Sequence, residues 1–236
     1  MGWGTVFKLT PSNGGWAESV LYSFTGGSDG ASPYSDVILD QAGNLYGTTW
    51  QGGVSGCAFG TGCGTVYQLT PSGSGWKENT LYSFQSATDG GNPPAGLIFD
   101  PSGNLYGATW TDGPGGGGTV FELSPADGSW TFTSLYALNG TGGPAGSLVM
   151  DGAGSLYGTT DSDGAHGVGS VFKLTPSNGG WIYTSLYDFT GGSDGYFPLC
   201  RVVFDTSGNL YGTTYAGGNN NDCGGYGCGV VWEITP

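Results

Sequence analysis

The chain has 236 residues, of which 51 are glycine and 14% are aromatic, and its formal net charge is −14 with only four Lys and Arg. Nucleic acids and anionic membrane surfaces are bound through clusters of Lys and Arg, so both are excluded as partners. Disorder is excluded because disordered chains are poor in aromatic residues. A helical bundle is excluded because Gly and Thr form helices poorly. No apolar run reaches the ~18 residues of a membrane span, so we expect no membrane insertion.

An internal repeat organises the whole sequence. The segment Gly-Thr-Val-Phe-Lys-Leu-Thr-Pro and two further blocks, Leu-Tyr-Ser-Phe and Asn-Leu-Tyr-Gly-Thr-Thr, recur in the same order along the chain. The Gly-Thr-Val segment or a close variant starts at Gly4, Gly64, Gly118, Gly169 and Gly229. This pattern indicates four copies of roughly 51 to 60 residues and a partial copy over residues 229–236. We therefore expect a single domain over residues 1–236.

Each copy contains four short runs that are typical of β-strands. In one copy these runs cover residues 95–100, 105–110, 119–123 and 130–138. They are rich in β-branched and aromatic residues and are bounded by Gly, Pro, Asn and Asp. Four antiparallel strands in a repeat of about 50 residues describe one blade of a β-propeller. The predicted fold is all-β, with the strands of a blade lettered A to D from the axis outward.

The order of the strands predicts how the propeller closes. The chain begins with C and D, continues through three whole A–B–C–D sets and ends with A, B and C, which makes four blades and one surplus C strand. We expect a four-bladed ring in which the C-terminal A and B strands join the N-terminal C and D strands, because closure removes open edges. The surplus strand at residues 230–235 then displaces the N-terminal copy or pairs elsewhere. The alternatives are a piece of a longer array and two chains that share blades.

Two pairs of cysteines lie in the same loop of two different copies. Cys57 and Cys63 form one pair, Cys223 and Cys228 the other, and each pair directly precedes a strand C. This recurrence predicts two local disulfides that staple long Gly-rich loops, and hence an oxidising compartment. The alternative is a zinc site built from the four thiolates.

The long loops predict a candidate binding site at one end of the blades. The D–A and B–C connections emerge at this end, and loops on a rigid scaffold commonly carry function. Strand B ends there at Trp50, Trp110, Asp161 and Tyr215 in successive copies, and the D–A connections carry Asp29, Asp89 and Asp194. Aromatic plates beside carboxylates suit a sugar, whose C–H faces stack and whose hydroxyls bond to acids. The alternative is that the aromatic residues cover the core and the aspartates are turn residues.

Catalytic motifs are scarce. The single histidine, His166, lies in a Gly-rich loop, and no Gly-x-Ser-x-Gly elbow accompanies it. Asp40, Asp100, Asp151 and Asp205 begin the A–B turns, where a carboxylate caps backbone N–H groups. We expect no catalytic residue, metal or cofactor, and predict a carbohydrate-binding or adhesive module. The alternatives are a structural protein that self-associates through edge strands, and a glycoside-active enzyme that uses acids such as Asp29 or Asp194.

The repeat resembles a known family. The pattern Phe-x₄-Asp-Gly-x₂-Pro, then Asp-x₂-Gly-Asn-Leu-Tyr-Gly-Thr-Thr, then Gly-Thr-Val-Phe-x-Leu-Thr-Pro is similar to the GloVer-type tandem repeat of exported bacterial "choice-of-anchor" proteins. It is clearest over residues 24–71 and 189–236, whereas the third copy lacks the Asp-Gly pair and has Ser155 in place of Asn. The resemblance implies an extracellular or cell-surface protein and implies no particular activity.

Overall fold

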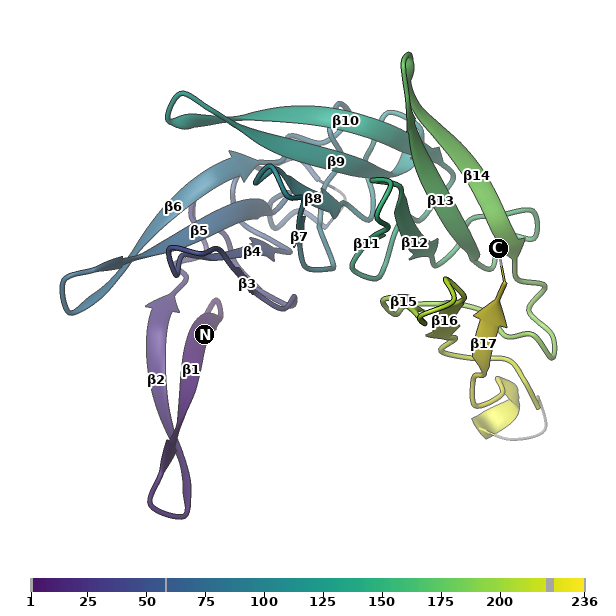
Figure 1. The fold of residues 1–236 in the computed structure, drawn as a ribbon, viewed down its shortest axis with the longest axis horizontal. Coiled ribbons are helices and arrows are strands. Elements are labelled where there is room, and N and C mark those ends of the chain that lie inside the picture. The colour runs from purple at the N-terminus through teal and green to yellow at the C-terminus, as the bar shows by residue number, and fades with distance from the viewer. Residues whose placement is uncertain (1, 58, 220–222, 236) are drawn as a thin grey trace.

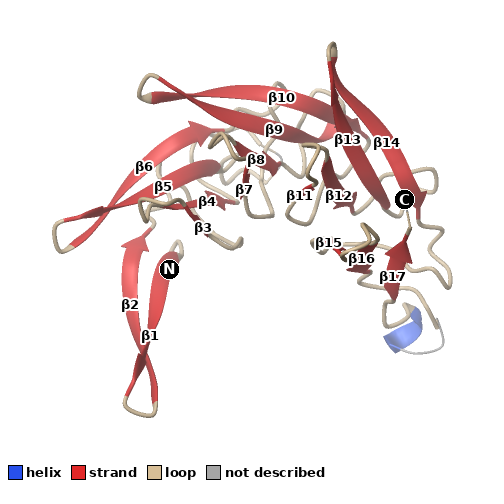
Figure 2. Ribbon diagram, in the orientation of Figure 1, coloured by secondary structure: helices blue, strands red, loops and turns tan. Residues whose placement is uncertain are grey.

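The computed structural model describes residues 2–57, 59–219 and 223–235, and these form an all-β protein with one short 3₁₀ helix at Cys223–Gly225 (Figure 2). Met1 and Pro236, the two ends of the predicted domain, lie outside the described residues. No helix in the described part of the chain is long and apolar enough to cross a membrane. The strands in chain order are β1 (Thr5–Ser12), β2 (Gly15–Ser23), β3 (Ile38–Leu39), β4 (Leu45–Thr49), β5 (Thr65–Ser72), β6 (Gly75–Ser83), β7 (Ile98–Phe99), β8 (Leu105–Ala108), β9 (Gly116–Ala126), β10 (Ser129–Asn139), β11 (Val149–Met150), β12 (Leu156–Thr160), β13 (Ser170–Ser177), β14 (Gly180–Asp188), β15 (Val203–Phe204), β16 (Leu210–Thr213) and β17 (Val231–Ile234).

These strands form five antiparallel sheets. Three are complete and have the orders β3-β4-β5-β6, β7-β8-β9-β10 and β11-β12-β13-β14, which confirms the predicted A–B–C–D order of a blade. The A strands are much shorter than predicted, because β7 pairs with β8 only through Ile98↔Tyr106 and Phe99↔Leu105. The Gly96 amide, before β7, instead donates to Ser147 Oγ at 3.1 Å, in the connection that leads to β11 of the next sheet.

The predicted closed ring of four blades is wrong. The five sheets follow one another around an open arc, with the β1–β2 hairpin at one end and the β15-β16-β17 sheet at the other (Figure 1). The surplus strand β17 takes the C position and pairs with β16 over Leu210↔Ile234 to Thr213↔Val231. The edge of β16 that β1 was predicted to join is therefore already occupied.

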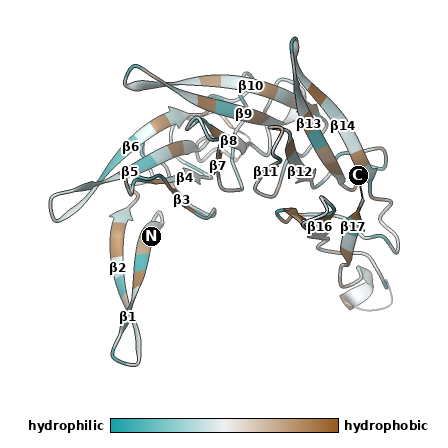
Figure 3. Ribbon diagram, in the orientation of Figure 1, coloured by the Kyte–Doolittle hydropathy of each residue, from teal (hydrophilic) through white to brown (hydrophobic). Residues whose placement is uncertain are grey.

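The core lies between the sheets. Each sheet has a leading face, which points toward the next sheet along the chain, and a trailing face, which points toward the previous one. In the junction between the first two complete sheets, Tyr46 and Val66 of the leading face pack with Leu97 and Phe121 of the trailing face. The other three junctions use equivalent residues of strand C, with Val6 against Tyr67, Val120 against Phe172, and Val171 against the partly buried Trp232. Apolar stretches recur along the strands, including the terminal β1–β2 hairpin (Figure 3).

A glycine in strand B makes room for an aromatic ring in strand C. A Cβ atom on Gly107 would lie 2.6 Å from Cζ of Phe121, and one on Gly158 would lie 2.7 Å from Cζ of Phe172. Both glycines are the register partners of these rings across the ladder. A larger residue therefore cannot occupy this position without displacing the ring.

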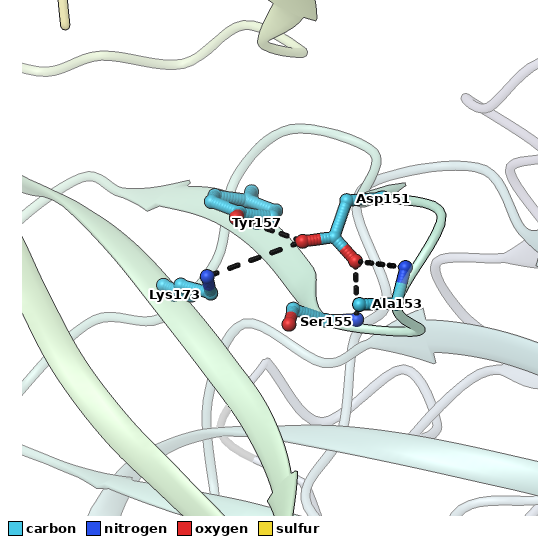
Figure 4. Close-up of polar contacts among 5 residues, drawn as sticks. All are labelled: Asp151, Ala153, Ser155, Tyr157 and Lys173. Atoms are coloured by element: carbon cyan, nitrogen blue, oxygen red, sulfur yellow. Dashed lines mark hydrogen bonds and ion pairs between the residues drawn. The ribbon is translucent and has the colours of Figure 1, made fainter. Parts of the chain in front are cut away.

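The A–B turns are held by the aspartates that the sequence assigned to them. Asp151 Oδ1 accepts hydrogen bonds from the Ala153 and Ser155 amides at 2.9 and 2.8 Å, and Oδ2 accepts one from the Tyr157 hydroxyl at 2.9 Å (Figure 4). Lys173 Nζ lies 4.0 Å from the same Oδ2. Desolvation opposes ionisation of Asp151, but these partners outweigh it and hold the pKa of the carboxyl below its usual value. The equivalent turns begin at Asp40, Asp100 and Asp205.

Candidate functional site

The last residue of each predicted B strand is fixed at the same end of its sheet. In each case its backbone amide donates to a carbonyl of the D–A connection of the same copy. The pairs are Trp50 to Ser32 at 3.0 Å, Trp110 to Asn92 at 3.3 Å, Asp161 to Gly143 at 3.3 Å and Tyr215 to Phe197 at 2.9 Å. This recurring bond holds the backbone of these four residues at the same place in successive sheets, and we refer to the four residues as the row.

Two members of this row meet in an aromatic cluster. The rings of Trp50 and Trp110 lie 5.6 Å apart between centroids, and Phe59 contacts both at 5.7 and 5.9 Å. Tyr34 extends the cluster at 6.2 Å from Trp50. We call Tyr34, Trp50, Phe59 and Trp110 the aromatic platform. Its outer members are open to solvent, with Tyr34 71% and Phe59 47% exposed, and the two tryptophans lie half-buried beneath them.

Asp161 completes the platform from the next sheet. Its Oδ2 accepts a hydrogen bond of 2.7 Å from Nε1 of Trp110, and its Oδ1 accepts one of 2.9 Å from the Ser162 hydroxyl. The residue as a whole is 9% exposed, and a side chain at Gly142 would collide with its carboxylate. Asp161 therefore fixes the orientation of the Trp110 ring, and Trp50, Trp110 and Asp161 form the part of the predicted site that the structure brings into contact.

A disulfide positions Phe59. Both predicted disulfides, Cys57–Cys63 and Cys223–Cys228, are present, and the alternative of a zinc site built from these cysteines is wrong. Cys57 and Cys63 are buried in the core between the first two complete sheets. The short loop that they close carries Phe59, so the covalent staple holds this ring over the two tryptophans.

Phe59 and Tyr34 were absent from the predicted site. Both lie in connections without hydrophobic periodicity, so strand patterns do not single them out. The signal for Phe59 is its place between two cysteines of a stapled loop, and Tyr34 follows Pro33 in the D–A connection that holds Trp50.

The three aspartates of the D–A connections close their own turns. Asp29 accepts from the Thr25 amide at 2.8 Å and the Tyr22 hydroxyl at 3.0 Å. Asp89 and Asp194 accept the equivalent tyrosine hydroxyls at 2.6 and 3.0 Å. Burial opposes ionisation of Asp29 and Asp194, but the hydrogen bonds prevail and lower the pKa of both carboxyls. These carboxylates thus serve the turns, as the alternative interpretation of the sequence predicted.

Tyr215 occupies the equivalent position in the last sheet. It follows β16 and is 72% exposed, and the nearby stapled loop carries Tyr226, which is 70% exposed. The last sheet therefore repeats the layout of exposed aromatic residues beside a disulfide loop, outside the platform itself.

Comparisons with known proteins place the chain in a family. A gluconolactonase from Xanthomonas campestris has a TM-score of 0.46 and 17% identity, over 85% of this chain and 56% of that one. A protein of unknown function from Dyadobacter fermentans has a TM-score of 0.46 and 13% identity, over 89% of this chain and 64% of that one. The chain thus spans less than two thirds of either protein, and it matches no curated protein. The model of the Gloeobacter/Verrucomicrobia repeat matches residues 1–236, so the chain belongs to that repeat family.

Proposed function

We propose that this protein is a non-catalytic carbohydrate-binding module and that the aromatic platform is its binding site. The observation that carries the proposal is the contact of Trp50, Trp110 and Phe59 at a solvent-exposed end of two neighbouring sheets. Monomeric soluble proteins rarely expose a contiguous group of large aromatic rings, and such a group commonly marks a binding site.

The chemistry of the platform suits a neutral or weakly basic polysaccharide. Ring faces take the C–H faces of a sugar and exclude water from the contact. Asp161 keeps unused acceptor capacity, because a carboxylate oxygen has two lone pairs and each of its oxygens accepts one hydrogen bond from the residues that the structure describes. With a formal net charge of −14 on the chain, an acidic polysaccharide would be repelled.

The two disulfides support a location of the protein outside the cytoplasm. Disulfides form and persist in oxidising compartments and are rare in the cytosol. The described structure holds two of them, in the B–C loops of two different sheets. We propose that the protein acts at the bacterial cell surface or outside the cell, where polysaccharides are available as ligands.

The test is a titration of the oxidised protein with a panel of neutral polysaccharides, followed by tryptophan emission. A saturable change in emission is expected, since Trp50 and Trp110 lie beneath the exposed rings. Phe59→Ala and Tyr34→Ala should each weaken binding by about tenfold, which corresponds to ~1.4 kcal/mol. Asp161→Asn keeps an acceptor for Trp110 and should have a smaller effect.

The matched control is Tyr226→Ala. Tyr226 is an exposed aromatic residue between the cysteines of the other stapled loop, as Phe59 is in its own loop. Its replacement should leave binding unchanged. The proposal would be overturned if no polysaccharide of the panel changed the tryptophan emission, or if Phe59→Ala and Tyr226→Ala weakened binding equally.

A further inference from the structure

Two sheet faces at opposite ends of the arc are exposed although their counterparts inside the arc are buried. On the trailing face of the β1–β2 hairpin, Phe7 is 53% and Leu9 49% exposed. The equivalent residues of the next sheet, Tyr67 and Leu69, are 1% and 0% exposed. On the leading face of the β15-β16-β17 sheet, Val231 is 79% exposed, whereas its equivalents Val66, Val120 and Val171 are all 0% exposed.

The two open faces are the two halves of one junction. Inside the arc, a leading face with a valine in strand C packs in all four junctions on a trailing face with an aromatic ring in strand C. The trailing strand C adds a leucine in three junctions and Ile234 in the last, and the three complete leading sheets add a tyrosine in strand B. The last sheet offers the leading half, with Val231 and Tyr211, and the hairpin offers the strand C and D part of the trailing half, with Phe7 and Leu9 in strand C. The open arc keeps these two halves apart within one chain (Figure 1).

A recurring contact between a tyrosine and a tryptophan ring shows how the two open faces would pack on each other. The strand-B tyrosine of one sheet contacts the strand-D tryptophan of the next, with centroids 6.2 Å apart for Tyr46 and Trp130 and 6.4 Å apart for Tyr106 and Trp181. The hairpin carries the equivalent tryptophan, Trp16, which is 68% exposed. Its counterpart is Tyr211 of the last sheet, which has no such tryptophan beside it in the described chain.

We propose that the trailing face of the β1–β2 hairpin of one copy docks on the leading face of the β15-β16-β17 sheet of a second copy. The second copy is the occupant because the contact repeats a junction that this sequence already forms four times within one chain. Docking joins sheet faces rather than the edge strands that the sequence suggested. The contact is head-to-tail, so it generates a ring or an open filament.

The experiment uses one variant for each face. Phe7→Asp blocks the hairpin face and Val231→Asp blocks the face of the last sheet, and both residues are exposed, so the fold should survive. Wild type should associate with increasing concentration in sedimentation velocity. Each variant alone should associate at least about tenfold more weakly, because docking would bury an unpaired carboxylate. Val54→Asp is the matched control, since Val54 is an exposed valine of the β4–β5 loop, and it should associate like wild type.

Mixing the two variants gives the decisive result. Each variant retains the face that the other has lost, so an equimolar mixture should form a one-to-one dimer and stop there. A wild type that stays monomeric, a mixture that stays monomeric, or single variants that still dimerise would each overturn the proposal. Should either aspartate variant lose its native circular dichroism spectrum, the pair Trp16→Ala and Tyr211→Ala provides the same test at the predicted ring contact.

Discussion

The inner sheets and the two end sheets carry similar residues at equivalent positions of the repeat, but an inner sheet has a neighbouring sheet on both faces and an end sheet on only one. Phe121 and Phe172 of the inner sheets are fully buried, whereas Phe7 at the same repeat position of the terminal hairpin is 53% exposed. Strand pairing in the hairpin is nevertheless the same, including a register shift after Val6 that recurs after Val66 and Val171. The strand ladder is therefore set within a copy, and burial is set by the neighbouring sheet. We therefore expect the same substitution to lower the free energy of unfolding more in an inner sheet than in an end sheet.

The largest difference is expected for the strand-C aromatic ring. Phe121→Ala should lower the free energy of unfolding by about 3–5 kcal/mol, because it leaves a cavity between two sheets. Phe7→Ala should lower it by about 0.5 kcal/mol or less, as for a surface position. Urea unfolding of both variants at concentrations where the chain is monomeric measures the contrast. Equal losses would show that the hairpin face is buried within a single chain.

The two disulfides should differ in how easily they are reduced. Cys57 and Cys63 are 5% and 0% exposed, whereas Cys223 and Cys228 are exposed in the loop between β16 and β17. Mild reductant followed by alkylation and peptide mass spectrometry should therefore label Cys223 and Cys228 first. Opening the Cys57–Cys63 loop should cost about 2 kcal/mol by loop entropy and should also loosen Phe59. First labelling of Cys57 would contradict the structure.

The turn aspartates predict a loss of stability in acid. Burial opposes ionisation of Asp100, but its hydrogen bonds with Ser102, Asn104 and Tyr106 lower its pKa from 3.8. The folded state then binds fewer protons than the unfolded state, so this contribution is complete above pH 3.8 and disappears as the pH falls through the lowered folded pKa. Asp100→Ala should cost about 1–2 kcal/mol at neutral pH.

The same variant should unfold with a shallower pH dependence in acid. Urea midpoints of wild type and Asp100→Ala, measured from neutral pH downward, should converge as the pH falls. Asp205→Ala, in the equivalent turn of the end sheet, provides the comparison and should show a smaller loss, because the Asp205 carboxyl lies closer to solvent than that of Asp100. Parallel curves for wild type and Asp100→Ala would mean that the carboxylate is not held in its ionised form by the turn.

The smallest effect is expected from salt. Two copies with a formal net charge of −14 repel each other, and the proposed docking faces contain apolar residues at their centres. Added salt screens this repulsion, so self-association should strengthen modestly as ionic strength rises. Sedimentation at low and high salt measures the change. Association that weakens with salt would indicate an ionic contact elsewhere on the surface.

Much of a single copy could be predicted from the sequence. The turn chemistry around Asp100 and the alternation of residues in β8 and β9 are local signals, and they placed the strands, the A–B turns and the disulfide loops. The open arc could not be predicted, because the angle between sheets depends on how rings such as Phe121 fill a junction, and periodicity within a copy carries no such information. Of the candidate site, the sequence named Trp50, Trp110 and Asp161, which the structure brings into contact, while Phe59 and Tyr34 depend on loop conformations.

The glycine of strand B has a consequence for sequence variation among copies of this repeat. Its missing side chain is the volume that a strand-C ring fills, so the two positions form one steric unit, as in the pair Gly107 and Phe121. A change to alanine at the first position is tolerated only with a smaller residue at the second. In related repeats the two positions should therefore covary, and the double change Gly107→Ala with Phe121→Leu should be less damaging than the sum of its parts.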